Sequence, residues 1–154
     1  MRLHRSFGLA TLAALLISYT AGLRAASIDF DAATIGDLNQ AFQAGTLTSE
    51  QLVQHCLARI EAYDEQGPKL NAVLTLNPKA IEIARALDAE RKSKGPRSPL
   101  HGIPVLLKDN FDTFDMPTTG GSVLLENWVP PDDAYVVKKL RDAGAIILAK
   151  VNLS

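Results

Sequence analysis

Lys108 ends the apolar run of the segment PLHGIPVLLKDN at 99–110, and Asp109 and Asn110 follow it at once. Burying an ammonium without a partner costs several kcal/mol, so a strand that carries one inward must provide a polar pocket or shift the amine toward neutrality. A neutral amine can accept protons, because desolvation lowers a lysine pKa from about 10.4 toward 5 or 6. Lys108 is therefore a candidate general base. The alternative is a structural lysine that pairs with Asp109 or with a carbonyl group at the strand end.

A polar turn, DMPTTGGS at 115–122, follows soon after Lys108. Its hydroxyls and unhindered backbone amides could line a pocket for a carbonyl group, although such turns are far more often only turns. The candidate substrate-binding residues are Thr118, Thr119, Gly120, Gly121 and Ser122. Ser122 is not favoured as a nucleophile, because no G-x-S-x-G elbow surrounds it and no histidine and acid stand in evident partnership with it.

The other reactive side chains favour structural roles. His101 precedes the strand in a turn, where a solvent-facing or capping role is expected. Cys56 shares a helix face with apolar residues, which predicts a buried thiol. No cysteine or histidine spacing resembles a zinc or haem site, and the carboxylates at 109–115 and 132–133 suit turns and helix starts. We expect no metal and no cofactor.

The elements that would position these residues alternate between helices and strands. Helices are expected at 34–45, from the capping box of Thr48 and Gln51 to Gly67, from Asn77 and Pro78 to about Lys92, and from a cap at Asp132 or Asp133 to Gly144. Strands are expected at 70–76, 103–108 and 145–149. The last strand, helix and strand have short joints, which indicates a parallel crossover and an α/β fold.

The strand at 103–108 is apolar on both faces, so it should lie inside a sheet that helices cover. The segment AIILAKVNLS at 145–154 is another strongly apolar strand pattern, but no closing helix or polar tail follows it. Ile146, Ile147 and Leu148 are therefore expected to lack neighbours. On this basis the chain is expected to be cut short, and unstable or prone to aggregation by itself.

The first 26 residues resemble an export signal. Arg2, His4 and Arg5 precede an apolar run that closes at Arg24 and small residues, and the run is too short and interrupted for a comfortable membrane span. Residues 27–154 then hold 13 basic and 17 acidic side chains, a formal charge of −4. This charge disfavours nucleic acid as a partner. We expect a periplasmic or extracellular protein that meets the membrane only through its signal.

Three segments taken in order, PLHGIPVLLKDN, DMPTTGGS and PDDAYVVKKLRDAGAIILAKVNLS, resemble the amidase signature family of serine hydrolases. They are most similar to its secreted bacterial branch, which includes peptide amidases. The resemblance is strong over 99–154 and looser over the preceding helices. It implies an α/β/α sandwich around a mixed sheet, of which residues 27–154 form the N-terminal portion. It also implies hydrolysis of a small amide or peptide amide, without metal or organic cofactor.

In this family, a serine nucleophile is activated by a second serine in a cis peptide. That second serine passes the proton to a lysine in a G-I-P-x-x-x-K-D motif. Lys108 matches that lysine, and the turn at 118–122 would form a wall of the site. Both family serines lie downstream of the segment that matches 145–154, and Ser154 matches neither. The resemblance therefore implies a chain that holds the base without the nucleophile, and that is inactive by itself.

Two other functions stay open at this point. The first is a non-catalytic exported binding or interaction module that recruits another chain through an exposed sheet edge. The second is a cytoplasmic amidotransferase subunit of the same family with an RNA-linked substrate, which the export signal argues against.

Overall fold

The computed structural model describes residues 28–153. The expected export signal at 1–26 lies outside this range, so it stays a prediction. The helices are α1 (Ile35–Ala44), α2 (Ser49–Ile60), α3 (Ala80–Lys94) and α4 (Tyr135–Asp142), with a π turn at Glu61–Glu65 and a 3-10 turn at Val123–Leu125. The strands are β1 (Val73–Leu76), β2 (Pro104–Lys108) and β3 (Ile146–Val151). None of the helices between residues 28 and 153 has the length and apolar character that a membrane span requires.

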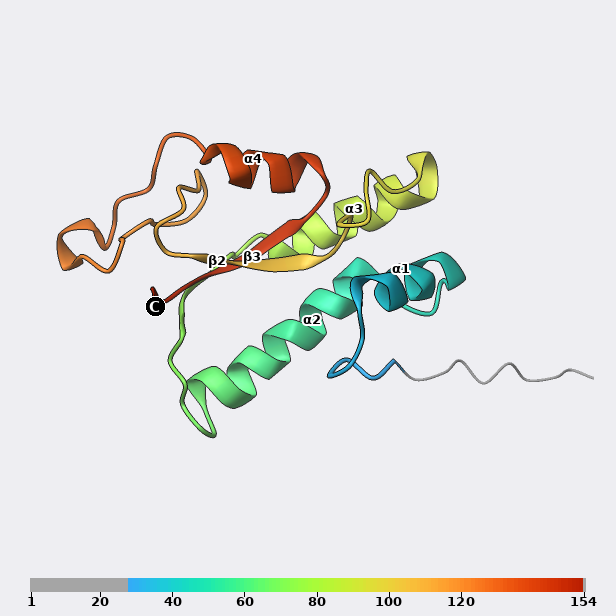
Figure 1. The fold of residues 1–154 in the computed structure, drawn as a ribbon, viewed down its shortest axis with the longest axis horizontal. Helices are drawn as coiled ribbons and strands as arrows, with labels where there is room; N and C mark the ends of the chain where they lie inside the picture. The colour runs from blue at the N-terminus through green and yellow to red at the C-terminus, as the bar shows by residue number, and fades with distance from the viewer. Residues whose placement is uncertain (1–27, 154) are drawn as a thin grey trace, which may run out of the picture.

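The three strands form one mixed sheet in the order β1-β3-β2 (Figure 1). β2 and β3 are parallel, and α4 connects them, so the predicted parallel crossover is confirmed. β1 runs antiparallel to β3 on its other side. In the parallel pair, Leu107 lies beside Lys150 and Lys108 lies beside Val151. The carboxyl ends of β2 and β3 therefore meet at one edge of the fold.

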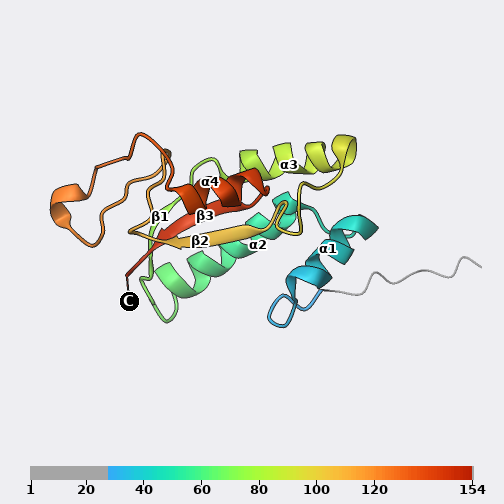
Figure 2. The same ribbon diagram turned by 45° about the horizontal axis from the view of Figure 1, so that its top comes forward.

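Helices cover both faces of the sheet (Figures 1 and 2). On one face, Ile146 and Leu148 of β3 pack with Val53 of α2 and with Ala84 and Leu87 of α3. On the other face, the residues that pack together are Leu107, Met116, Val137 and Ile147, from β2, the segment after it, α4 and β3. Burial on both sides gives the three-layer α/β/α arrangement that the sequence predicted.

The first two helices begin at capping boxes. The hydroxyl of Thr34 accepts the amide of Asp37, whose carboxylate accepts the Thr34 amide in return. Thr48 and Gln51 make the same exchange at the start of α2, as predicted. Each box satisfies backbone donors that the first turn of a helix leaves free, so it fixes where the helix begins.

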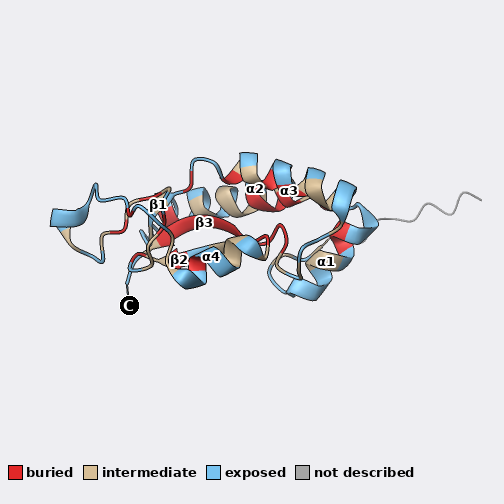
Figure 3. Ribbon diagram, turned by 90° about the horizontal axis from the view of Figure 1, so that it is seen from above, coloured by how far each residue is buried: buried red, intermediate tan, exposed pale blue. Residues whose placement is uncertain are grey.

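The predicted places of two strands in the sheet were wrong. β3 does not lack neighbours: it is the central strand, with Ile146 and Ile147 at 0% exposure, and Figure 3 shows it as the buried centre of the fold. β2 lies at an edge of the sheet within residues 28–153, and its Leu106 is 48% exposed. Apolar side chains on both faces indicate helical cover, but they do not reveal which strand is central, because strand order depends on pairing between distant segments.

Two predicted helix starts were also displaced. α4 begins after Ala134 without a side-chain cap, because Asp133 accepts the Phe114 amide and pairs with Arg141 at 2.9 Å instead. At α3, the Asn77 side chain accepts the amide of Lys79, so its cap closes a turn that precedes the first helical residue. Local spacing predicted that Asp133 and Asn77 cap these helices. In the structure, Asp133 makes tertiary contacts and Asn77 closes a turn instead.

Candidate active site

Lys108 is the last residue of β2, at the edge where the two parallel strands end. It is half-buried, and its Nζ donates a hydrogen bond to the carbonyl oxygen of Asn152 at 3.0 Å. The backbone directly after β3 therefore holds the amine of Lys108 in place. Sites in open α/β sheets gather at the carboxyl ends of strands, and Lys108 lies at such a place.

Asp109 connects this strand end to the turn that follows. Its amide donates to Val151 O at 2.9 Å, and its carbonyl accepts the amide of Gly120 at 3.1 Å. Its carboxylate accepts both the amide of Thr119, at 3.1 Å, and the hydroxyl of Thr119. The side chain is 1% exposed. Asp109 thus serves as a buried anchor for the turn, whereas the neighbouring Asn110 is exposed.

The turn residues predicted to bind substrate gather around Asp109. The hydroxyl of Thr119 also accepts the amide of Gly121, and the carbonyl of Thr119 accepts the amide of Ser122. Gly120 and Gly121 have φ values of +57° and +79°, a backbone conformation that side chains disfavour. The turn therefore lies beside the strand end that carries Lys108, and Figure 2 shows the whole segment between β2 and α4 at that end of the sheet.

Lys150 is a charged residue near this site that the sequence interpretation missed. Its side chain is fully buried, and its Nζ donates to the hydroxyl of Thr118 at 2.7 Å and to the carbonyl of Pro117 at 3.1 Å. Oδ1 of Asp109 lies 3.5 Å from the same nitrogen. Burial lowers the pKa of Lys150, and the charge of Asp109 opposes that shift. The signal was available, since Lys150 interrupts an apolar strand just as Lys108 ends one.

A β-bulge explains why Lys150 reaches the turn. Leu148 is an extra residue in β3, because the β2 residues that pair on either side of it are consecutive. A bulge re-aims the side chains that follow it. Strict alternation would put Lys150 on the face of Leu148, toward α2 and α3. Lys150 instead pairs with Leu107, which packs beneath α4, so its ammonium enters the layer that contains the turn.

His101 is buried, which corrects the expected solvent-facing position. Its Nε2 lies 2.9 Å from Leu87 O, and its Nδ1 accepts the amide of Arg97. With both ring nitrogens engaged by backbone groups, the imidazole joins α3 to the segment before β2.

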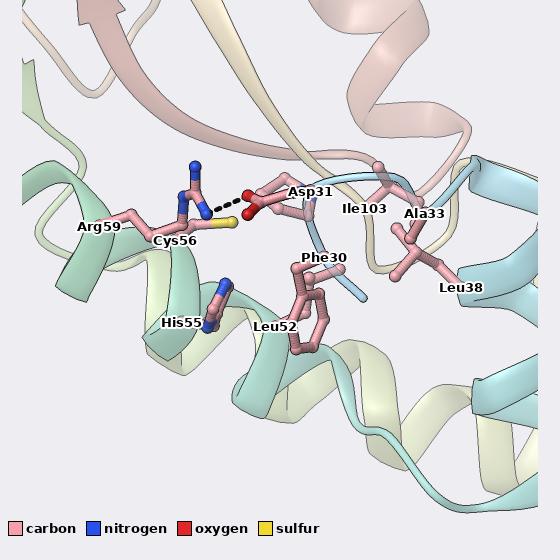
Figure 4. A pocket seen from close by; sticks show the side chains of 10 residues that line it. Phe30, Asp31, Ala33, Leu38, Leu52, His55, Cys56, Arg59 and Ile103 are labelled. Atoms are coloured by element: carbon pink, nitrogen blue, oxygen red, sulfur yellow. Dashed lines mark hydrogen bonds and ion pairs between the residues drawn. The ribbon is translucent and has the colours of Figure 1, made fainter. Parts of the chain in front are cut away.

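Cys56 lines a separate pocket of about 330 Å³ at the opposite end of β2, near Pro104 (Figure 4). There, Arg59 of α2 pairs with Asp31, and the ring of His55 stacks on Phe30 with centroids 4.1 Å apart. The thiol is half-buried, and burial raises its pKa. A raised pKa makes the thiol a poor nucleophile, so this pocket does not add a reactive group to the site around Lys108.

Comparison with known proteins identifies the family. The model of the family described as amidase matches residues 51–154. The chain belongs to the amidase family. This family explains the α/β/α layers and confirms the resemblance of the segments around Lys108 and the following turn.

Similar structures and sequences support the assignment. The peptide amidase of Stenotrophomonas maltophilia has a TM-score of 0.79 and 48% identity, with 82% of this chain and 26% of that protein covered. An amidase family protein of Bacillus anthracis has a TM-score of 0.76 and 43% identity, with 80% and 24% covered. A glutamyl-tRNA(Gln) amidotransferase subunit of Streptomyces coelicolor is 42% identical over 121 residues, which cover 78% of this chain and 24% of that protein. The chain thus spans about a quarter of the length of these relatives.

Proposed function

We propose that this chain forms the N-terminal part of an amidase that hydrolyses carboxamide C–N bonds, with Lys108 as the general base. The observation that carries the proposal is the placement of the Lys108 amine. It lies at the carboxyl end of a parallel strand, held by the carbonyl of Asn152 at 3.0 Å, in a chain of the amidase family. Ordered amines at this edge of an α/β sheet are well placed for chemistry.

The hydrogen bond to Asn152 is compatible with the role of a base. A neutral amine has two N–H donors and one lone pair, and the bond to the Asn152 carbonyl uses a donor. A neutral Lys108 would therefore keep its lone pair free to accept a proton. The bond also limits the rotation of a long side chain, which lowers the entropy cost of placing the amine for proton transfer.

The proposed reaction is acyl transfer through two serines that the rest of the polypeptide supplies. The nucleophilic serine attacks the amide carbonyl while its proton passes to the second serine, whose own proton passes to Lys108. The C–N bond then breaks, and the leaving nitrogen takes up a proton from Lys108 through the second serine. Water cleaves the resulting ester by the same route, which yields a carboxylic acid and regenerates both serines.

The turn at 118–122 would form a wall of the substrate pocket. Asp109 fixes the backbone of the turn through hydrogen bonds to Thr119 and Gly120. Because Gly120 and Gly121 have no side chains, an amide group could approach this backbone closely. We propose a linear carboxamide, such as a peptide amide, as the substrate class. The likeness to the peptide amidase supports this choice, and the formal charge of −4 over residues 27–154 disfavours an RNA-linked substrate.

We also propose that the protein is exported, on the basis of the N-terminal pattern of Arg2, His4 and Arg5 before an apolar run. The test is to sequence the N-terminus of the protein recovered from the periplasm or medium. Cleavage between Ala21 and Ser27 is the expected result. An intact Met1 in a protein confined to the cytoplasm would refute export.

The enzymatic proposal is tested with the full-length gene product and a dipeptide C-terminal amide. We expect release of ammonia and the matching dipeptide acid in equal amounts. The 154-residue chain alone should release none, because it would hold the base without either serine. Ammonia release by the 154-residue chain, or none by a longer folded gene product, would contradict the proposal.

A non-catalytic binding module is the second candidate, favoured by an apolar groove of about 410 Å³. Its exposed side chains include Tyr63 of the π turn, Leu70 of the loop before β1 and Leu106 of β2. An apolar groove of this kind could receive a segment of another chain. Under this hypothesis, Leu106→Asp would weaken partner binding, whereas Lys108→Ala would leave it intact.

A further inference from the structure

Three consecutive residues at the end of β3 each hold a different part of the candidate site. Lys150 donates to Pro117 and Thr118 in the turn. Val151 accepts the amide of Asp109, and Asn152 accepts the amine of Lys108 at 3.0 Å. The end of β3 therefore contacts the turn, Asp109 and Lys108 together. Of these three residues, Lys150 contacts the site through its charged side chain, whereas Val151 and Asn152 contact it through their backbone carbonyls.

A buried ion pair is weak evidence for a purely stabilising role. Desolvation of two charges costs about as much as their attraction returns, and apolar residues of similar volume often replace such a pair without loss of stability. Lys150 and Asp109 are 0% and 1% exposed, so neither is screened by water. An apolar side chain could not reproduce the directed hydrogen bonds that the ammonium makes. The ammonium points at two oxygens of the turn and one of Asp109, at 2.7, 3.1 and 3.5 Å.

The contacts of Thr118 make this direction specific. Its hydroxyl receives the ammonium of Lys150 and donates onward to the carbonyl of Phe111 at 3.2 Å, while its amide donates to the carbonyl of Trp128 at 3.0 Å. A hydroxyl that accepts one bond and donates another is fixed in rotation. Lys150 thus holds the turn through the hydroxyl of Thr118, and Asp109 holds the neighbouring Thr119.

We propose that Lys150 is a positioning residue of the active site. Its ammonium holds Asp109 and the turn at 115–122 in place beside the end of β2 that carries Lys108. This inference rests on the proposed amidase function. Lys150 itself does not touch substrate in this arrangement, because it lies buried beneath the turn. Its effect on the reaction comes through the placement of Lys108 and of the pocket wall.

The test separates position from stability by means of two variants of the full-length gene product. Lys150→Met alone leaves the Asp109 carboxylate buried without its cation, so it is expected to lower the melting midpoint. The double variant Lys150→Met with Asp109→Asn removes both charges at similar volume and should regain most of that midpoint. Lys138→Met, at an exposed lysine of α4, is the matched control.

The proposal predicts that the folded double variant keeps a kcat/KM at least about tenfold below that of the unaltered protein, since displacement of reacting groups by about 1 Å can cost 100-fold. Thr118→Val, which removes the hydroxyl bound by Lys150, should lower kcat/KM in the same direction. A double variant that regains both stability and kcat/KM would show that Lys150 only neutralises Asp109. A double variant that does not fold would show that Lys150 serves stability, and would equally overturn the proposal.

A second readout does not depend on amide hydrolysis. Competitive acetylation, quantified by mass spectrometry, compares the reactivity of Lys108 with that of exposed Lys138 in the folded protein. The ratio should change several-fold in the double variant and stay constant in a control such as Lys79→Met. If no amide is cleaved by any form but the ratio changes, the proposed function fails while the positional role of Lys150 stands. An unchanged ratio would refute that role.

Discussion

The ammonium of Lys150 lies 3.5 Å from Oδ1 of Asp109, and both side chains are buried beneath the turn that follows β2. One partner belongs to the central strand and the other to the end of the edge strand. Because Asp109 also holds Thr119 and is the chain neighbour of Lys108, this pair joins the core of the sheet to the candidate active site. Changes in either charge should therefore affect both stability and the site.

Asp109→Ala should lower the free energy of unfolding by about 3–5 kcal/mol, because it leaves Lys150 as a buried, uncompensated cation. Urea unfolding followed by circular dichroism measures the change. Asp142→Ala is the matched control, since Asp142 pairs with Lys138 on the exposed surface of α4 and should cost less than about 1 kcal/mol. Similar losses in the two variants would argue against a tightly coupled buried pair.

Gly102→Ala should destabilise the fold more than Gly45→Ala does. Both glycines have positive φ, +82° and +69°, which costs an alanine about 1–2 kcal/mol. A Cβ at Gly45 would meet open space, whereas one at Gly102 would lie 2.0 Å from the hydroxyl oxygen of Ser49. The difference between the two losses in unfolding free energy reports this clash. Equal losses would mean that α2 and the segment before β2 can separate freely.

The thiol of Cys56 should react slowly with Ellman's reagent at about pH 8, because burial raises its pKa and so lowers the fraction of thiolate. The chain has one cysteine, so absorbance reports Cys56 alone. Unfolding in urea restores the ordinary thiol pKa and should speed the reaction several-fold. Equal rates in the folded and unfolded chain would contradict the buried environment.

Acid should weaken the fold partly through Glu90. The hydrogen bond from Arg97 holds the pKa of this carboxyl below its ordinary value, so the pair stabilises the folded state above about pH 4.5. That contribution is lost as the pH falls through the lowered folded pKa. Glu90→Gln should therefore show a smaller drop in unfolding free energy between about pH 6 and pH 3. Glu126→Gln, at an exposed site, is the control for removing one charge.

The sequence predicts local elements of this fold well, where local chemistry decides them. Thr48 and Gln51 set the start of α2 through contacts within one turn of chain, and Gly45 ends α1 because its φ of +69° suits a residue without a side chain. The crossover between β2 and β3 was also predictable, since short connections through a helix impose parallel strands.

Strand order and the shared environment of the two lysines were not predictable in the same way. The apolar patterns of β2 and β3 are alike. Within residues 28–153, however, β3 is the central strand and β2 lies at an edge, because β3 also pairs with β1, whose residues are about 75 positions away. The bulge at Leu148 moves the side chain of Lys150 to the opposite face of the sheet, and no local sequence pattern predicts this bulge. The sequence therefore predicts Lys108 and the turn as candidates, but it gives no indication that the buried cation of Lys150 contacts the turn and Asp109.

Substitution of Lys108 tests the central claim most directly. In the full-length gene product, Lys108→Ala should reduce kcat for hydrolysis of a dipeptide amide by several powers of ten, because it removes the proton acceptor of the serine relay. The melting midpoint should change little, since Lys108 is half-buried and makes its bond at the rim of the sheet. Lys138→Ala should leave kcat unchanged. Ammonia release by the Lys108→Ala protein at the rate of the unaltered protein would contradict the account.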